Sequence, residues 1–339
     1  MSNKFLSTTS AFLLSTSMLV AEVPKVTVDI APVHSLVSKV MNGVGKPDLI
    51  IPAGASPHEY QLKPSNAKSL QNADIVFWIG EDLTPWLEKG LSSLAQDASI
   101  TSLLDLSGLE LLSFREGALF EAHDHGEDHD DHDDHDHDKK KHDDHDDHDD
   151  HDHDKKKHDD HDDHDDHAHG EHDPHAWLSP QIAKIWLNVI AAKLSEVDPD
   201  NAAKYFSNAK SARDNVDSLV SEVNSILDPM REKKFVVFHD AYQYFERDFG
   251  ISASGAISLG DASDPSPARL SEIRRRVVDE AVQCVLAEPQ YDPGLVKSVV
   301  EGTDAKTTVI DPLGVSLETG PNLYENLIRN LATNLAKCF

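Results

Sequence analysis

The feature that most limits what this chain can fold into is a long segment built from aspartate, histidine and lysine. The unit HDHDKKKHDDHDDHDD occupies residues 135–150 and recurs without change at 151–166. Residues 121–173 contain 26 acidic residues, 17 histidines and six lysines, and the repeated unit has no apolar residue to bury. We therefore expect 121–173 to be a disordered insert, so that the flanking sequence must make the fold.

Most of the charge of the chain lies in this insert. The formal net charge is −30 over 339 residues, and −20 of it falls within 121–173. The remainder carries the charge of an ordinary acidic protein, with no basic face and no interleaving of aromatic and basic residues. We therefore expect no nucleic-acid partner.

Residues 1–21 have the pattern of an export signal. Lys4 supplies a positive end, an apolar run extends from Ala11 to Val20, and Ala21 fits a cleavage point. The run is short and interrupted by serine and threonine, so we do not expect it to span a membrane. The pattern predicts a periplasmic protein.

On both sides of the insert, strand-like and helix-like stretches alternate. Short stretches rich in β-branched residues lie at 25–30, 48–51, 74–79, 235–238, 284–287 and 307–310. Segments of helical periodicity separate them, which predicts βαβ units and parallel sheets flanked by helices. We therefore expect an α/β fold with an N-terminal lobe at 22–120 and a C-terminal lobe at 229–339.

Residues 174–228 are predicted to be a helical connection between these lobes. Ser179 and Pro180 form a good helix start. Further on, apolar residues recur every three or four positions from Tyr205 to Leu227. This spacing predicts one amphipathic helix of roughly seven or eight turns, long enough to be a rigid backbone between the lobes.

Four histidines lie outside the insert: His34, His58, His175 and His239. His58 and His239 each follow a predicted strand, one in each lobe, and His175 lies in the loop before the connecting helices. Because ligands of open α/β sheets bind beyond the carboxyl ends of the strands, a cleft between the lobes would bring these three together. Three imidazoles suit tetrahedral zinc with one position left open. His34, at a helix start, is expected to pack there and stay out of the site.

The fourth zinc ligand stays open. Asp311 is the first candidate because it directly follows the strand predicted at 307–310. Glu59, beside His58, is the second candidate, and water is the third. Each carboxylate has a simpler explanation, since Asp311 could begin a turn and Glu59 could be a solvated loop charge.

Several stretches outside the insert resemble the zinc-binding solute-binding proteins of ABC transporters, the high-affinity zinc-uptake type. The matching stretches are GASPHEYQLKPSNAKSLQNADIVFWIGEDL, PHAWLSP, FVVFHDAYQYFE, CVLAEPQ and DPLG. A His/Asp-rich insert is also typical of this branch. Members have two α/β lobes joined by a long backbone helix and hold the metal between the lobes. The resemblance implies that His58, His175 and His239 bind zinc for delivery to a membrane permease and its ATPase, and we expect a monomer.

The resemblance also bears on the fourth ligand and on the two cysteines. Pro57 stands where some zinc-uptake relatives have a glutamate ligand, and manganese-binding relatives use a carboxylate at the position of Asp311. Three histidines still favour zinc over manganese. From the residues alone, Cys284 and Cys338 either form a disulfide or remain two buried thiols; the resemblance implies the disulfide.

Three other interpretations compete with zinc import by a binding protein. A manganese-binding importer component would carry a different metal. In a zinc store or chaperone, the insert would be the functional part. In the zinc importer, we expect the insert to be a low-affinity zinc collector. A zinc hydrolase would need an open metal position and a general base, as in HExxH, and the sequence has no such motif. We therefore expect no enzyme activity.

Overall fold

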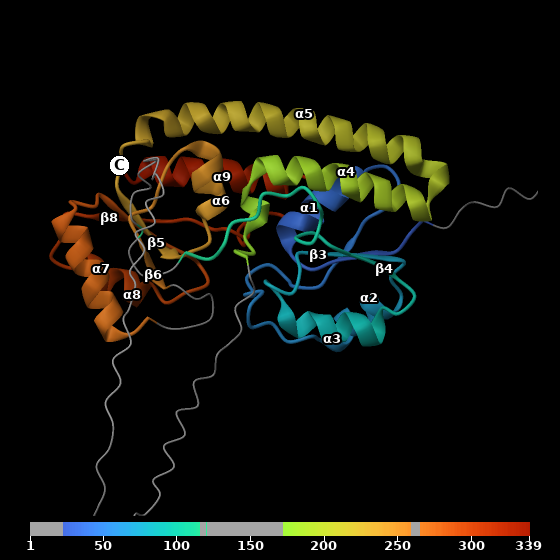
Figure 1. The fold of residues 1–339 in the computed structure, drawn as a ribbon, viewed down its shortest axis with the longest axis horizontal. Helices are drawn as coiled ribbons and strands as arrows, with labels where there is room; N and C mark the ends of the chain where they lie inside the picture. The colour runs from blue at the N-terminus through green and yellow to red at the C-terminus, as the bar shows by residue number, and fades with distance from the viewer. Residues whose placement is uncertain (1–22, 116–119, 121–171, 259–264) are drawn as a thin grey trace, which may run out of the picture. The chain divides into compact units, whose positions relative to one another are not determined.

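A computed structural model describes residues 23–115, 120, 172–258 and 265–339 of the chain (Figure 1). The predicted export signal and nearly all of the predicted insert lie outside these residues. The described residues belong to one compact unit. None of the helices in this part of the chain combines the length and the apolar character needed to cross a membrane.

The first lobe is built on a parallel sheet with strand order β2-β1-β3-β4. Its elements are β1 (Val26–Val28), α1 (Ala31–Val40), β2 (Asp48–Leu49), α2 (Pro64–Gln71), β3 (Ile75–Trp78), α3 (Pro85–Leu94) and β4 (Ser99–Ser102). The central strands β1 and β3 are buried at every residue, as expected for a parallel sheet covered on both faces. The edge strand β4 has only one buried residue, Thr101, which is why its sequence lacks the apolar pattern of a strand.

The second lobe repeats this topology with strand order β6-β5-β7-β8. Its elements are β5 (Phe235–His239), α6 (Gln243–Phe249), β6 (Ala256–Ser258), α7 (Pro267–Asp279), β7 (Cys284–Ala287), α8 (Pro293–Val300) and β8 (Lys306–Val309). The predicted fold of two parallel sheets flanked by helices is confirmed. In each lobe the first and third strands lie side by side, which is the switch point where ligands of such sheets bind.

A helical layer joins the lobes. It contains η1 (Ala176–Leu178), α4 (Pro180–Val197), η2 (Pro199–Asn201), α5 (Ala202–Leu227), η3 (Asp228–Met230) and the last helix α9 (Leu323–Lys337). As predicted, Ser179 caps α4, since its Oγ accepts the N–H of Ile182 at 3.1 Å. The predicted long helix is confirmed as α5, which has 26 residues and packs on α1, α4 and α9 (Figure 1). Its length is about 39 Å.

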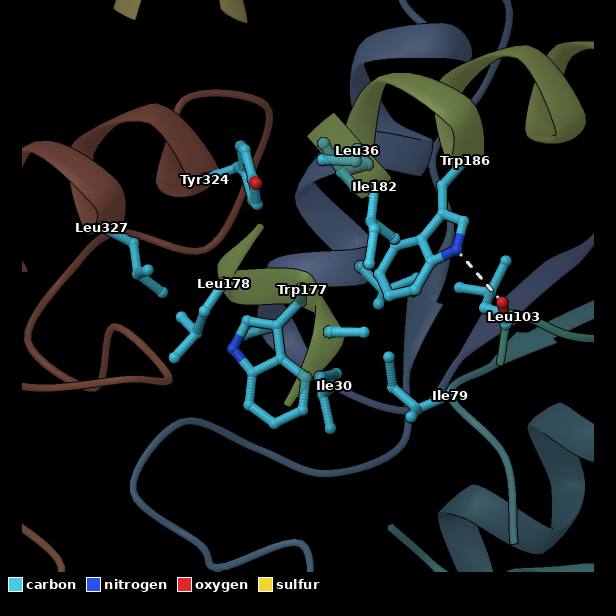
Figure 2. Packing of buried hydrophobic residues seen from close by; sticks show 14 of the residues in the cluster. Ile30, Leu36, Ile79, Leu103, Trp177, Leu178, Ile182, Trp186, Tyr324 and Leu327 are labelled. Carbon is cyan, nitrogen blue, oxygen red and sulfur yellow. Dashed lines mark hydrogen bonds between the residues drawn. The ribbon is translucent and has the colours of Figure 1, made fainter. Parts of the chain in front are cut away.

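The lobes and the connection share one hydrophobic core, part of which Figure 2 shows. The indole of Trp186 in α4 donates to the carbonyl of Leu103 in the first lobe at 3.1 Å (Figure 2). Lys39 in α1 pairs with Glu325 in α9 at 2.8 Å, so the first lobe also contacts the last helix directly. Packed helices therefore hold the lobes together.

The two cysteines form a disulfide. Cys284 in β7 and Cys338 at the end of α9 are both buried, and their Cα atoms lie 5.8 Å apart. The bond therefore fastens the last helix to the central part of the second sheet, as the family resemblance implied.

Replacing both cysteines by alanine is expected to lower the free energy of unfolding by about 4 kcal/mol, because the bond closes a loop of 54 residues. Urea denaturation under oxidising conditions measures the change. A reductant should destabilise the wild type but not the double variant. An unfolding free energy within about 1 kcal/mol of the wild type would contradict this estimate.

Candidate metal centre

The structure brings three histidine rings together from three separate parts of the chain. The ring centroids of His58 and His175 lie 5.8 Å apart, and those of His175 and His239 lie 5.3 Å apart. His58 comes from the loop after β2, His175 from the residue before η1, and His239 from the end of β5. His239 is predicted from the sequence to lie just after its strand, but it is the last residue of that strand.

The loop that carries His58 is held by side chains of the helices that follow it. Trp86 in α3 donates its indole N–H to the carbonyl of Pro57 at 2.8 Å. Asn66 in α2 donates to the carbonyl of Ile50 at 2.9 Å, before the loop. The same Asn66 side chain accepts the hydroxyl of Tyr60 at 3.0 Å, after His58. These contacts hold the loop on both sides of His58, whose side chain is half-buried.

His175 is held by a buried carboxylate. Oδ1 of Asp173 lies 2.8 Å from Nδ1 of His175 and 2.9 Å from its backbone nitrogen. His175 is 1% exposed, and Asp173 is fully buried. The predicted insert boundary therefore needs a correction, because Asp173 was assigned to the disordered segment and instead packs into the fold. Its backbone N–H bonds to the carbonyl of Leu112 at 2.8 Å.

His239 is held in the same way. Oε1 of Glu288 lies 2.7 Å from Nδ1 of His239 and 3.3 Å from its backbone nitrogen. Glu288 directly follows β7, the neighbour of β5 in the sheet, and both side chains are buried. A carboxylate that accepts from Nδ1 keeps the proton on that nitrogen and presents Nε2 as the electron-pair donor, which is the usual arrangement of metal-binding histidines.

The three rings line one small cavity of about 20 Å³. The cavity is also lined by Ser56, Pro57, Trp177, Glu288, Gln290, Tyr291, Pro312 and Leu313. Trp177 contacts two other lining residues. Its ring lies 5.1 Å from that of His175, and its N–H donates to the carbonyl of Pro312 at 2.8 Å. The volume suits a single ion or water molecule.

The spacing of the rings is close to that of a zinc site. A tetrahedral zinc ion with Zn–N bonds of about 2.0–2.1 Å places two ligand imidazole centroids roughly 5.2 Å apart. The pair His175 and His239 fits this spacing, whereas the pair His58 and His175 is wider by roughly half an ångström. Consistent with that, no group of three histidine, cysteine, aspartate or glutamate side chains in the described ranges is already arranged to hold a metal ion.

The two predicted carboxylate ligands are not among the residues that line the cavity. Oδ1 of Asp311 accepts the backbone N–H groups of Leu313 and Gly314 at 3.1 and 2.9 Å, which is the turn that the sequence also allowed. Glu59 is exposed. His34 stays out of the site, as expected: its Nε2 lies 3.0 Å from the carbonyl of Pro47, and burial lowers its pKa.

Sequence reasoning missed three side chains at this site, Asp173, Glu288 and Gln290. A signal existed for Glu288, because it follows a predicted strand just as His239 does. Asp173 stands two residues before His175, but its place at the end of an Asp/His-rich segment concealed it. Gln290 ends the stretch CVLAEPQ that carries the family resemblance, but no role was predicted for it.

With this geometry in view, comparison with known proteins identifies the family. The family model for zinc-uptake complex component A periplasmic (ZnuA) matches residues 26–338. The chain belongs to this family. ZnuA proteins are solute-binding proteins for zinc uptake and not enzymes.

Individual ZnuA proteins match over nearly the whole chain. The high-affinity zinc uptake system protein ZnuA of Brucella abortus (strain 2308) is 48% identical over 322 residues, which cover 95% of this chain and 93% of the relative. The protein of the same description from Paracoccus denitrificans (strain Pd 1222) is 45% identical over 319 residues, with 94% and 92% covered.

Solved structures share the fold. A crystal structure of ZnuA superposes with a TM-score of 0.70 at 20% identity, covering 94% of this chain and 99% of that one. A ZnuA deletion mutant with zinc bound gives a TM-score of 0.68 at 20% identity, covering 94% and 98%.

Replacing Glu288 by glutamine is expected to raise the zinc dissociation constant about tenfold, because the amide is a weaker acceptor for Nδ1 of His239 than the carboxylate. Competition with a chelator of known zinc affinity measures the change. Glu222→Gln is the matched control. Glu222 lies exposed on the long helix α5, where it pairs with Arg329 of α9. Equal affinities in both variants and the wild type would refute a supporting role for Glu288.

Proposed function

We propose that this chain captures one zinc ion between its two lobes and delivers it to the membrane permease of an ABC importer, driven by its ATPase. It would act as a monomer in the periplasm. Membership of the ZnuA family makes zinc uptake the function of the chain. The observation that carries the proposed site is the convergence of three imidazoles from two lobes and their connection.

The proposed ligands are Nε2 of His175, Nε2 of His239 and the imidazole of His58. In His175 and His239, Nδ1 is engaged by a carboxylate, so the opposite nitrogen faces the ion. Neutral imidazoles favour zinc, whereas manganese prefers oxygen ligands such as carboxylates. This donor set supports zinc over manganese as the cargo.

For the fourth position we propose water. Oδ1 of Asp311 is occupied by its turn, Glu59 is exposed, and neither residue lines the cavity. Gln290 lines the cavity, and in the described part of the structure both polar atoms of its side chain are buried without a hydrogen-bond partner. Buried polar atoms without hydrogen bonds are costly. A metal-bound water beside Gln290 would form hydrogen bonds with its side-chain amide and would also fill the fourth ligand position of the ion.

We expect zinc to be released without a wide separation of the lobes. The packed layer of α1, α4, α5 and α9 would limit relative movement to small tilts. His58 is the most exposed of the three proposed ligands and sits on a loop, so a small displacement of that loop by a docked permease would open the coordination shell there first.

Replacing His239 by alanine is expected to weaken zinc binding by well over about 100-fold, beyond the effect of losing a supporting carboxylate. Isothermal titration calorimetry measures the tight site. Circular dichroism and thermal unfolding of the metal-free variant verify that it is folded. Tight binding that survives in a folded His239→Ala protein would refute the proposed site.

Replacing residues 122–171 by a short Gly-Ser linker tests the role of the insert. One tight zinc site should remain with unchanged affinity, while several weak sites disappear from the titration, because histidines of the insert bind separately from the cavity. A deletion of 122–173 is the matched control: it also removes Asp173, and the tight site should weaken about tenfold or more.

Each alternative predicts a different result in these titrations. Loss of the tight site on removal of 122–171 would favour a zinc store or chaperone. Manganese that competes with zinc at equal concentration for the tight site would favour a manganese importer component.

A further inference from the structure

A short backbone segment of the first lobe crosses to the second lobe beside the proposed zinc site. We call residues 110–115 the cross-lobe strap. Three hydrogen bonds tie its backbone to α6: Arg247 Nη1 to the carbonyl of Glu110 at 3.1 Å, the N–H of Leu112 to the hydroxyl of Tyr244 at 3.0 Å, and Gln243 Nε2 to the carbonyl of Ser113 at 3.1 Å. The strap therefore lies along a helix of the other lobe.

The strap ends in a buried ion cluster. The guanidinium of Arg115 binds both carboxylate oxygens of Asp240 through Nε, at 3.0 and 2.9 Å, and Asp240 also accepts from Nη2. The same guanidinium donates to both oxygens of Glu246 in α6, at 2.9 and 3.1 Å. The ring of Phe120 covers it at 3.6 Å. Only a planar guanidinium can make two such forked contacts at once.

This cluster is one residue away from a proposed ligand. Asp240 directly follows His239, so Arg115 fixes the backbone at the point where β5 ends. The carboxylate partner of His239, Glu288, is supplied from the neighbouring strand. The position of His239 is thus set from both sides.

The strap also holds the support of the second ligand. Asp173 donates its backbone N–H to the carbonyl of Leu112 in the strap. Its carbonyl accepts the Tyr244 hydroxyl at 2.9 Å, and its Oδ2 accepts from Gln243 at 3.1 Å. Both of these α6 residues bond to the strap as well. Asp173 in turn orients His175.

We propose that Arg115 is a positioning residue for zinc binding: by fastening the cross-lobe strap to Asp240 and Glu246, it sets the spacing between His175 and His239. The inference rests on the proposed zinc site. Without this anchor the strap and the end of β5 would sample other positions, and only part of the population would have the rings in place. The apparent zinc affinity falls in proportion to the fraction of molecules that have both rings in place.

The first test is Arg115→Lys, because an ammonium group can pair with one carboxylate but cannot fork across two. We expect the zinc dissociation constant to rise about tenfold. Since removing one charge from a buried cluster can unfold a protein, the second variant combines Arg115→Met, Asp240→Asn and Glu246→Gln. It leaves no unpaired charge and should lose affinity to a similar extent. Affinities are measured at a temperature where each metal-free protein is fully folded.

A purely structural role for Arg115 would leave the geometry of the bound metal unchanged, so a second readout is the visible absorption spectrum of the Co²⁺-loaded protein. We expect both variants to shift or weaken the cobalt bands. Arg329→Gln is the matched control: it removes an arginine that bridges α9 to Glu222 in α5, and it should alter neither affinity nor spectrum.

The outcomes separate this inference from the proposed function. Wild-type zinc affinity and superimposable cobalt spectra in both Arg115 variants would overturn it, and so would an equal loss in Arg329→Gln. In those cases His239→Ala would still abolish tight binding. If His239→Ala also bound zinc tightly, the zinc site itself would be wrong.

Discussion

The arrangement of the candidate site depends on two buried hydrogen bonds, from Nδ1 of His175 to Asp173 and from Nδ1 of His239 to Glu288. A buried carboxylate oxygen is costly unless it is hydrogen-bonded, so each bond favours one relative position of ring and carboxylate. The bond also selects the tautomer that can bind a metal. One pair belongs to the connection and the other to the second lobe. Their mutual placement is therefore a property of the packing between these parts.

That packing distinguishes this architecture from lobes on a flexible hinge. The indole of Trp186 reaches the first lobe, Trp177 reaches the loop after β8, and the ion pair of Lys39 and Glu325 joins the first lobe to the last helix. Moving one lobe as a rigid body would break several of these buried contacts at once. Metal exchange by local movement of a loop costs less, because fewer contacts change.

Much of the fold could be predicted from the sequence because its signals are local. Buried parallel strands appear as β-branched stretches, and α5 shows its apolar spacing directly. The positions of His58 and His239 near the ends of strands follow from those stretches. The pairing of Glu288 with His239 could not be predicted, because it depends on strand order. Asp311 and Glu288 both follow a strand, but β7 lies beside β5 while β8 is at the edge, so only Glu288 meets His239. The sequence stretches that resemble the family also do not state which strand lies beside β5.

The hydrogen bond between Asp173 and Leu112 brings the C-terminal end of the Asp/His-rich insert beside a segment that lies shortly before its N-terminal end. The entropy of closing a loop between fixed ends grows only with the logarithm of its length, so the loss of one 16-residue unit would alter folding by only a few tenths of a kcal/mol. Duplication or loss of units is thus nearly neutral for the folded body. The number of units can therefore vary in evolution without any change in the residues around the cavity.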